Sequence, residues 1–243
     1  MLSIVIPVYN EEENLNSVIE ELLENIDTQS PYEIIFVDDS SDDNTFLNIK
    51  AINLQNNNIK ILRLARRSGS HIATKAGIDA SSGDKLLVIS GDGQEDPALI
   101  KDMISNIADG FDIVWGVRDV REENLFSRLV TKIFYKGLVR FTKNTTNYSV
   151  DISNADFYML GNKVINELKK TSLKNSSLFG LLAWVGFKQI SLPYKRRKRL
   201  NGNSKWGLKS KLSLAIDWYI SSVSYTHLTL PTKLSVEVSV GGG

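Results

Sequence analysis

Apolar and polar positions follow two spacings over the first 118 residues, one typical of strands and the other of helices. Short runs rich in β-branched and aromatic residues predict strands over 3–8, 33–38, 59–64, 85–90 and 111–117. Apolar residues at helical spacing predict helices over about 15–26, 43–55, 71–80 and 97–108. Asn10 and Glu13 have the spacing of a capping box for the first helix, and Asp96 with Pro97 resembles the start of the last. This alternation predicts an α/β fold, in which a mostly parallel sheet carries helices on both faces.

Beyond residue 118 the pattern changes. An amphipathic helix is predicted over 125–141, and its basic residues at steps of four form either a solvated face or a membrane-surface face. The elements predicted after it are a strand over 156–160, a helix over 162–170, a strand over 188–194 and a helix from 206 to about 223. We expect one α/β domain made of two parts, 1–118 and 119–223. Residues 224–243 continue no pattern, and we interpret them as a non-native tail.

Polar residues follow three of the predicted strands at their carboxyl ends. Glu11 follows the first strand, Asp38 and Asp39 the second, and Asp92 and Gln94 the fourth. A single aspartate after a strand commonly serves as a helix cap. Parallel strands, however, bring their carboxyl ends to one edge of the sheet, where ligands bind. A carboxylate and an amide two residues apart suit a divalent metal on a diphosphate. The pattern therefore favours an enzyme that handles nucleotides.

Composition and charge exclude several classes of protein. The 243 residues carry a net charge of +1 and no cysteine, which excludes disulfides and thiolate metal sites and gives no overall field for nucleic acid. The glycine fingerprint of dehydrogenases and the lysine loop of P-loop NTPases are absent. We find neither a signal-peptide pattern nor a run of about 20 apolar residues. Residues 195–205 hold six cations and no acid, which favours phosphate binding, because guanidinium groups match phosphate oxygens.

Taken in order along the chain, several short motifs resemble those of family 2 glycosyltransferases of the GT-A fold, close to the dolichyl- or polyprenyl-phosphate sugar synthases. The matching segments span residues 4 to about 223, and they are 4–12, 36–42, 92–97, 116–118, 156–157 and 196–206. Each segment alone is short, and their common order makes the resemblance specific. In this resemblance 1–118 is the nucleotide-sugar half, and 119–223 is the acceptor-binding part of the same domain.

The resemblance implies roles at matched positions. Pro7, Tyr9, Glu11, Asp38 and Asp39 would contact the nucleotide. The catalytic residues would be Asp92, which with Gln94 would hold Mg²⁺ or Mn²⁺ on the donor diphosphate, and Asp156, the candidate base. The phosphate and acceptor positions would be Arg118, Arg196, Arg199, Ser204 and Lys205.

The chain departs from the family pattern at three places. Ser90 stands where the family has the first of two aspartates, so Asp92 is the one that remains. The turn Arg66-Arg67-Ser68-Gly69 replaces the family's Arg-Asn-aromatic-Gly. Many relatives carry two membrane helices after the catalytic part, so we expect a native protein with such helices that are missing here.

The reaction that the resemblance implies is inverting transfer of a sugar from a nucleotide diphosphate sugar to a polyprenyl phosphate. The expected location is the cytoplasmic face of the membrane. The alternatives are transfer to a saccharide hydroxyl of a cell-surface polysaccharide, or nucleotide-sugar binding without catalysis. The expected partners are a UDP- or GDP-linked sugar, the polyprenyl phosphate, the membrane surface and, as an option, a second copy of the chain. Nucleic acid is not among them.

Overall fold

The computed structural model describes residues 1–119, 155–171, 178, 182 and 187–198. The predicted helices over 125–141 and from 206 to about 223 lie outside the described residues, as do the candidate ligands Arg199, Ser204 and Lys205. In the described part, no helix is long and apolar enough to cross a membrane.

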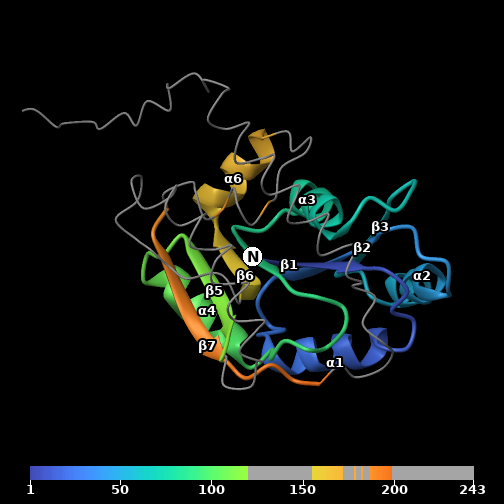
Figure 1. The fold of residues 1–243 in the computed structure, drawn as a ribbon, viewed down its shortest axis with the longest axis horizontal. Helices are drawn as coiled ribbons and strands as arrows, with labels where there is room; N and C mark the ends of the chain where they lie inside the picture. The colour runs from blue at the N-terminus through green and yellow to red at the C-terminus, as the bar shows by residue number, and fades with distance from the viewer. Residues whose placement is uncertain (120–154, 172–177, 179–181, 183–186, 199–243) are drawn as a thin grey trace, which may run out of the picture.

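A sheet of seven strands forms the centre of the described fold, in the order β3-β2-β1-β4-β6-β5-β7 (Figure 1). The strands are β1 Leu2–Val8, β2 Tyr32–Asp38, β3 Ile59–Arg63, β4 Lys85–Val88, β5 Ile113–Arg118, β6 Ala155–Gly161 and β7 Gln189–Tyr194. Strands β1 to β4 pair in parallel, and β5 pairs in parallel with β7. Strand β6 runs antiparallel to both of its neighbours. The predicted α/β fold with a mostly parallel sheet is confirmed.

Helices cover both faces of the sheet, because successive residues of each strand point to opposite sides. In β1, Ile4 and Ile6 belong to the core cluster shared with helices α1, α2 and α4, whereas Val5 belongs to the cluster shared with α3 and α6. In the view of Figure 1, α1 lies below the sheet and α3 and α6 lie above it. The helices are α1 Leu15–Asn25, α2 Thr45–Gln55, α3 Ser70–Ala80, α4 Leu99–Ala108 and α6 Asn162–Lys170.

The predicted helix caps are wrong at two places. Asn10 does not cap α1, which begins five residues later at Leu15. Asn10 instead adopts a left-handed backbone with φ of 55°, and its side-chain oxygen accepts a hydrogen bond from the backbone N–H of Asp42 at 2.9 Å. Helix α4 begins at Leu99 rather than Pro97, although Asp96 does accept a hydrogen bond from the N–H of Ala98 at 3.1 Å. Both residues organise the loops at the carboxyl edge of the sheet.

At the opposite edge of the sheet, the buried Glu33 of β2 joins several elements through its carboxylate. Its carboxylate accepts hydrogen bonds from the Ser3 hydroxyl and from the backbone N–H of Ser82, both at 2.6 Å, and it pairs with Lys60 at 2.6 Å. Burial alone would raise the pKa of Glu33, but these donors outweigh it and hold the pKa below its usual value. The amino ends of β1, β2 and β3 and the loop before β4 are therefore joined through one carboxylate.

Candidate active site

The carboxyl ends of β1, β2 and β4 lie side by side, and the beginning of β6 joins them because β6 runs the opposite way. Val88 of β4 pairs with Tyr158 of β6, so Asp156 lies beyond the end of β4, next to the loop that follows it. We call residues 90–95 the acidic loop. We call residues 195–198, which follow β7, the basic strap.

Ser90 lies between two carboxylates of the acidic loop. Its hydroxyl oxygen is 2.6 Å from Asp92 Oδ1 and 2.6 Å from Glu95 Oε2. A hydroxyl has one hydrogen to donate, so both contacts are hydrogen bonds only when one of the two carboxyl groups carries a proton and donates it to Ser90. Burial raises the pKa of Glu95 to about 7, and the charge of Asp92 adds to this effect. Near neutral pH a proton on Glu95 is therefore readily available for the hydrogen bond to Ser90.

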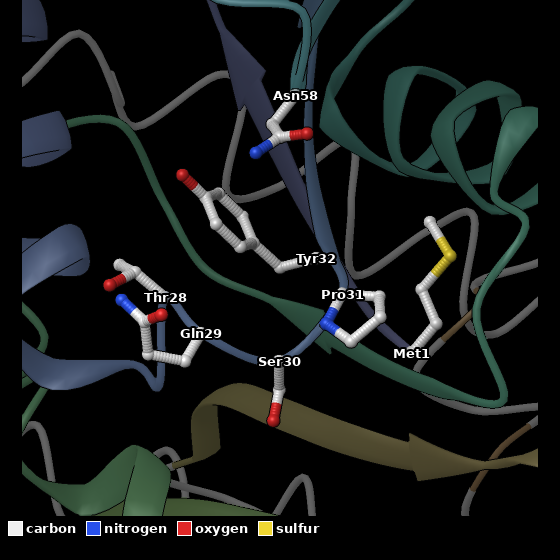
Figure 2. Close-up of a pocket in the computed structure, with 7 residues that line it drawn as sticks. All are labelled: Met1, Thr28, Gln29, Ser30, Pro31, Tyr32 and Asn58. Atoms are coloured by element: carbon white, nitrogen blue, oxygen red, sulfur yellow. The ribbon is translucent and has the colours of Figure 1, made fainter.

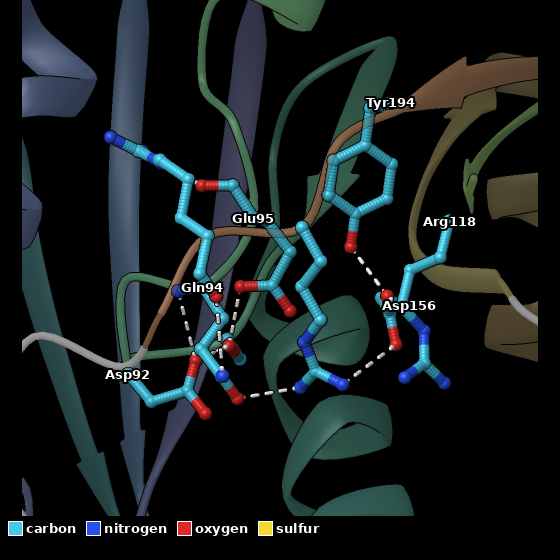
Figure 3. A network of polar contacts seen from close by, with 9 residues as sticks. Asp92, Gln94, Glu95, Arg118, Asp156 and Tyr194 are labelled. Atoms are coloured by element: carbon cyan, nitrogen blue, oxygen red, sulfur yellow. Dashed lines mark hydrogen bonds and ion pairs between the residues drawn. The ribbon is translucent and has the colours of Figure 1, made fainter. Parts of the chain in front are cut away.

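The turn of the acidic loop places Asp92 and Gln94 on the same side. Gly93 has a left-handed backbone with φ of 70°, which a residue with a side chain rarely adopts. This turn lets the N–H of Gln94 donate to Asp92 Oδ1 at 3.2 Å. The side chains of Asp92 and Gln94 then lie close together at the mouth of the loop, as Figure 3 shows.

Asp156 is held by a hydroxyl and two guanidinium groups (Figure 3). The Tyr194 hydroxyl donates a short hydrogen bond to Asp156 Oδ2, and Arg118 Nε lies 2.9 Å from the same oxygen. Arg196 approaches the other oxygen, Oδ1, at 3.7 Å. Burial raises the pKa of Asp156, whereas Tyr194, Arg118 and Arg196 act in the opposite direction. The pKa of Tyr194 is raised by burial and by Asp156, so the tyrosine remains the donor.

The basic strap lies against the acidic loop and bonds to it through both backbone and side chains. The N–H of Arg197 donates to the carbonyl of Gln94 at 2.9 Å, and Gln94 Nε2 donates to the carbonyl of Arg197 at 3.4 Å. Arg196 donates to Gln94 Oε1 at 2.6 Å. Arg196 therefore links Gln94 to Asp156, two of the predicted site residues that are far apart in the sequence.

A second group of predicted residues surrounds Tyr9 at the ends of β1 and β2. The guanidinium carbon of Arg67 lies 4.1 Å from the centre of the Tyr9 ring, and the Tyr9 hydroxyl bonds to Asp42 at 3.0 Å. Asp39 accepts hydrogen bonds from the N–H groups of Ser68 and Gly69 at 2.7 and 2.8 Å. Asp39 therefore fixes the turn that carries Arg67 over Tyr9.

The remaining nucleotide candidates lie beneath this group. Asp38 is fully buried, pairs with Arg63 at 3.2 Å, and accepts a hydrogen bond from the N–H of Ser41. Glu11 is 8% exposed and bonds to the side-chain amide of Asn14 at 2.6 Å. Pro7 is part of β1, opposite Val37 of β2. These three residues therefore contribute to the structure at the end of the sheet more than to its exposed surface.

The structure brings Asp92, Gln94, Asp156, Arg118 and Arg196 into one network, and their individual roles stay predictions. Sequence reasoning gave no role to Glu95, although it stands within the matched segment 92–97. It also missed Tyr194, whose position directly before the basic run was the available signal. Neither signal predicts the contacts that these residues make. Tyr194 and Asp156 come from separate parts of the chain, and the contact of Glu95 with Ser90 depends on the turn at Gly93.

Asp92 and Gln94 fit a divalent cation that is completed by a ligand. In the described part of the chain, no group of three or more acidic or histidine side chains could hold a metal by itself. Mg²⁺ is commonly held by one or two carboxylates together with substrate phosphates, and Asp92 with the amide oxygen of Gln94 matches such a partial set. Gln94 Oε1 presently accepts a hydrogen bond from Arg196, so metal binding requires this guanidinium to leave that oxygen.

A shallow pocket of about 350 Å³ lies at the other end of the sheet (Figure 2). Its lining comes from the amino ends of β1 and β2 and the loop before β3, and comprises Met1, Thr28, Gln29, Ser30, Pro31, Tyr32 and Asn58. No carboxylate or guanidinium side chain is among them. The chemistry of the described residues is therefore concentrated at the carboxyl edge and not in this pocket.

Comparison with known proteins identifies relatives over nearly the whole chain. Residues 3–168 match the model of the family described as glycosyl transferase family 2. An uncharacterized glycosyltransferase of Bacillus subtilis, YkcC, is 35% identical over 242 residues, which are 99% of this chain and 73% of YkcC. The undecaprenyl-phosphate 4-deoxy-4-formamido-L-arabinose transferase of Salmonella choleraesuis is 28% identical over 244 residues, again 99% of this chain and 73% of the relative.

Solved structures share the fold at low sequence identity. Glucosyl-3-phosphoglycerate synthase from Mycobacterium tuberculosis, in complex with Mn²⁺, UDP and glucosyl-3-phosphoglycerate, superimposes with a TM-score of 0.61 at 16% identity. The match covers 92% of this chain and 79% of the synthase. TarS of S. aureus gives a TM-score of 0.56 at 14% identity, over 96% and 75% of the two chains. These likenesses support the fold alone.

Proposed function

Because the chain belongs to glycosyltransferase family 2, we propose that it moves a sugar, with inversion, from a nucleotide diphosphate sugar to a polyprenyl phosphate. The family and the GT-A fold were expected from the motifs, and both expectations are confirmed. The inversion, the nucleotide sugar donor and the polyprenyl phosphate acceptor are the parts that we propose.

The observation that carries the proposal is the set of donors on Asp156. The oxygens of Asp156 already accept a hydrogen bond from Tyr194 and face Arg118 and Arg196, which leaves them little room to take a proton from an acceptor hydroxyl. A phosphate monoester has a second pKa near ~6, so it is largely ionised at neutral pH and needs no base. Arg118 beside an orienting carboxylate therefore suits an acceptor that is already an anion.

The donor would lie across the acidic loop and the group around Tyr9. Tyr9 and Arg67 provide a stacked surface at the end of β1, and Asp92 lies at the end of the neighbouring β4. Asp92 and Gln94 would hold Mg²⁺ or Mn²⁺, which neutralises part of the diphosphate charge when it is bound. Arg196 would then exchange Gln94 for an oxygen of the donor diphosphate.

Support for a lipid acceptor also comes from the Salmonella choleraesuis relative, whose name specifies undecaprenyl phosphate. A lipid acceptor requires the protein to work at a membrane surface, and we propose the cytoplasmic face, where nucleotide sugars are available. The predicted basic face of 125–141 would suit that surface through attraction to anionic lipids.

The test is transfer of labelled sugar from UDP-glucose, UDP-N-acetylglucosamine and GDP-mannose to undecaprenyl phosphate, with Mg²⁺ or Mn²⁺ and with EDTA. We expect one donor to give a lipid-extractable product that EDTA abolishes. Asp92→Asn should lower the rate on the order of 100-fold, because it removes the charged ligand at the diphosphate. Asp156→Asn keeps the side-chain shape and an acceptor oxygen, and it should lower the rate by about tenfold or less, with an unchanged pH profile.

A saccharide hydroxyl acceptor is the second candidate, and the burial that raises the pKa of Asp156 favours it, since a better base is then present. In that case Asp156→Asn should cost on the order of 1,000-fold and remove the acidic limb of the pH profile. The lipid-phosphate proposal fails if transfer goes to saccharides and not to undecaprenyl phosphate. Donor binding without transfer to either acceptor would support a non-catalytic binding module.

A further inference from the structure

We propose that Arg197 is a positioning residue, which clasps α1 and thereby holds Arg196 at the place where the donor diphosphate binds. This inference rests on the proposed function, since it assigns a diphosphate to the space beside Asp92. Arg197 itself contacts no group that reacts. Its effect is exerted through the neighbouring residue of the basic strap.

The side chain of Arg197 is fixed by three oxygens. Its Nη2 lies 2.7 Å from Glu21 Oε2 and its Nη1 lies 3.3 Å from Glu21 Oε1, so the pair is bidentate. Nη2 also donates to the carbonyl of Glu95 at 2.8 Å. Glu21 belongs to α1 and lies 176 residues before Arg197, so the clasp joins the first helix to the segment that follows the last described strand.

The backbone of the same residue fixes the direction of the strap. The exchange of hydrogen bonds between Arg197 and Gln94 aligns the strap with the acidic loop. With the Arg197 side chain turned toward α1, that of Arg196 lies on the other side, where it reaches Gln94 at 2.6 Å and Asp156 at 3.7 Å. The two adjacent arginines therefore have different tasks: one anchors the segment and the other faces the site.

The clasp orders the strap in advance and thereby lowers the entropy cost of binding the diphosphate. An arginine side chain loses rotamer entropy when it is immobilised, and a loosely held strap adds backbone entropy to that cost. Ordering the strap before the ligand arrives removes part of this cost from binding. The clasp acts on substrate and transition state alike, so its loss should raise the Kd and the KM and leave kcat nearly unchanged.

The experiment measures binding of pyrophosphate, UDP and GDP by calorimetry in the presence of Mg²⁺, and KM and kcat of the transfer reaction. Pyrophosphate reports the diphosphate site whatever base the donor carries. We compare the wild type with Arg197→Gln, Glu21→Gln, Arg196→Gln and the double variant of Arg196 and Arg197. The matched control is Lys170→Gln, which removes an exposed ion pair of α6 at 2.8 Å and the same single charge.

We expect Arg197→Gln and Glu21→Gln each to weaken pyrophosphate binding about tenfold and to raise KM by a similar factor, because a bidentate ion pair is lost. Lys170→Gln should stay within about twofold, as for an exposed pair. In the Arg196→Gln background, Arg197→Gln should cost nothing further, since the residue through which it acts is absent. A purely structural role would make the two losses additive.

Two results would overturn the inference. Equal pyrophosphate affinity in the wild type, Arg197→Gln and Glu21→Gln would overturn it and leave the proposed function intact. Additive losses in the double variant would also overturn it. A wild type that binds none of the three ligands would overturn both this inference and the proposed function, whereas binding without lipid transfer would count against the proposed acceptor only.

Discussion

Ser90 shows how one hydroxyl adapts a site that lacks the family's first aspartate. The hydroxyl contacts Asp92 and Glu95, so it connects a second carboxylate to the proposed metal ligand Asp92. Hydrogen bonds of this kind orient a ligating carboxylate, and their loss commonly lowers metal affinity by ten- to a hundredfold. We therefore predict that Ser90 affects metal binding without being one of the metal ligands.

Ser90→Ala should raise the Mn²⁺ concentration that gives half-maximal activity by about tenfold, because Asp92 then loses the donor that fixes its oxygen. Ser90→Thr keeps the hydroxyl and should stay close to the wild type. The measurement is a titration of transfer activity with Mn²⁺, together with direct Mn²⁺ binding by electron paramagnetic resonance. Identical half-saturation in Ser90→Ala and the wild type would exclude this role.

At the scale of single elements, α3 depends on a glycine that lets it approach the sheet. A methyl group on Gly77 would overlap with a side-chain methyl of Val5 on β1. Alanine in place of glycine favours a helix by about 1 kcal/mol, but forcing an atom into a packed core costs about 1–3 kcal/mol. The steric cost is the larger of the two, because Val5 is fully buried and has no space to move into.

Gly77→Ala should therefore lower the free energy of unfolding, by about 1 kcal/mol net. Urea denaturation followed by circular dichroism measures this change. The double variant with Val5→Ala makes room for the new methyl group, so the glycine substitution should become neutral or stabilising in that background. A loss of the same size in both backgrounds would show that contact with Val5 is not its cause.

The elements themselves were predicted with unequal success, for physical reasons. The central strands were found to within one or two residues, because strands buried on both faces read as continuous apolar runs. The cap predicted for α1 was wrong because Asn10 binds Asp42, which lies 32 residues away and cannot be seen in a local cap pattern. The reversed direction of β6 was not foreseen either, since its direction depends on the long connection that precedes it.

The same limit applies to the site. Asp92 and Gln94 could be predicted because they follow one strand within three residues of each other. That Tyr194 and Arg118 meet Asp156 depends on the pairing of β5 with both β6 and β7, which no local pattern specifies. No feature of the sequence pointed to Glu21, because glutamates on the polar face of an amphipathic helix are common.

At the scale of the whole molecule, Glu33 makes stability depend on pH. Its folded pKa is lowered, so the stabilisation that it provides is fully present above its unfolded pKa, near ~4.3, and is lost as the pH falls through the folded pKa. Glu33→Gln should lower the free energy of unfolding by about 2 kcal/mol at pH 7, because buried donors lose a charged acceptor. Urea denaturation at pH 7 and at pH 3 measures both proteins, and the difference between them should shrink at pH 3. A difference that stays constant with pH would contradict the assignment.

The clasp between Glu21 and Arg197 also has a consequence for how the protein is made. Gln94 bonds to partners that lie about a hundred residues later in the chain, and α1 bonds to one that lies 176 residues later. A ribosome delivers the chain from its amino end, so the nucleotide half can be folded while the strap is still inside the exit tunnel. Until Arg196 and Arg197 emerge, the nascent chain has the acidic loop without the cations that balance it. The proposed site therefore stays incomplete until the segment that follows β7 has left the ribosome.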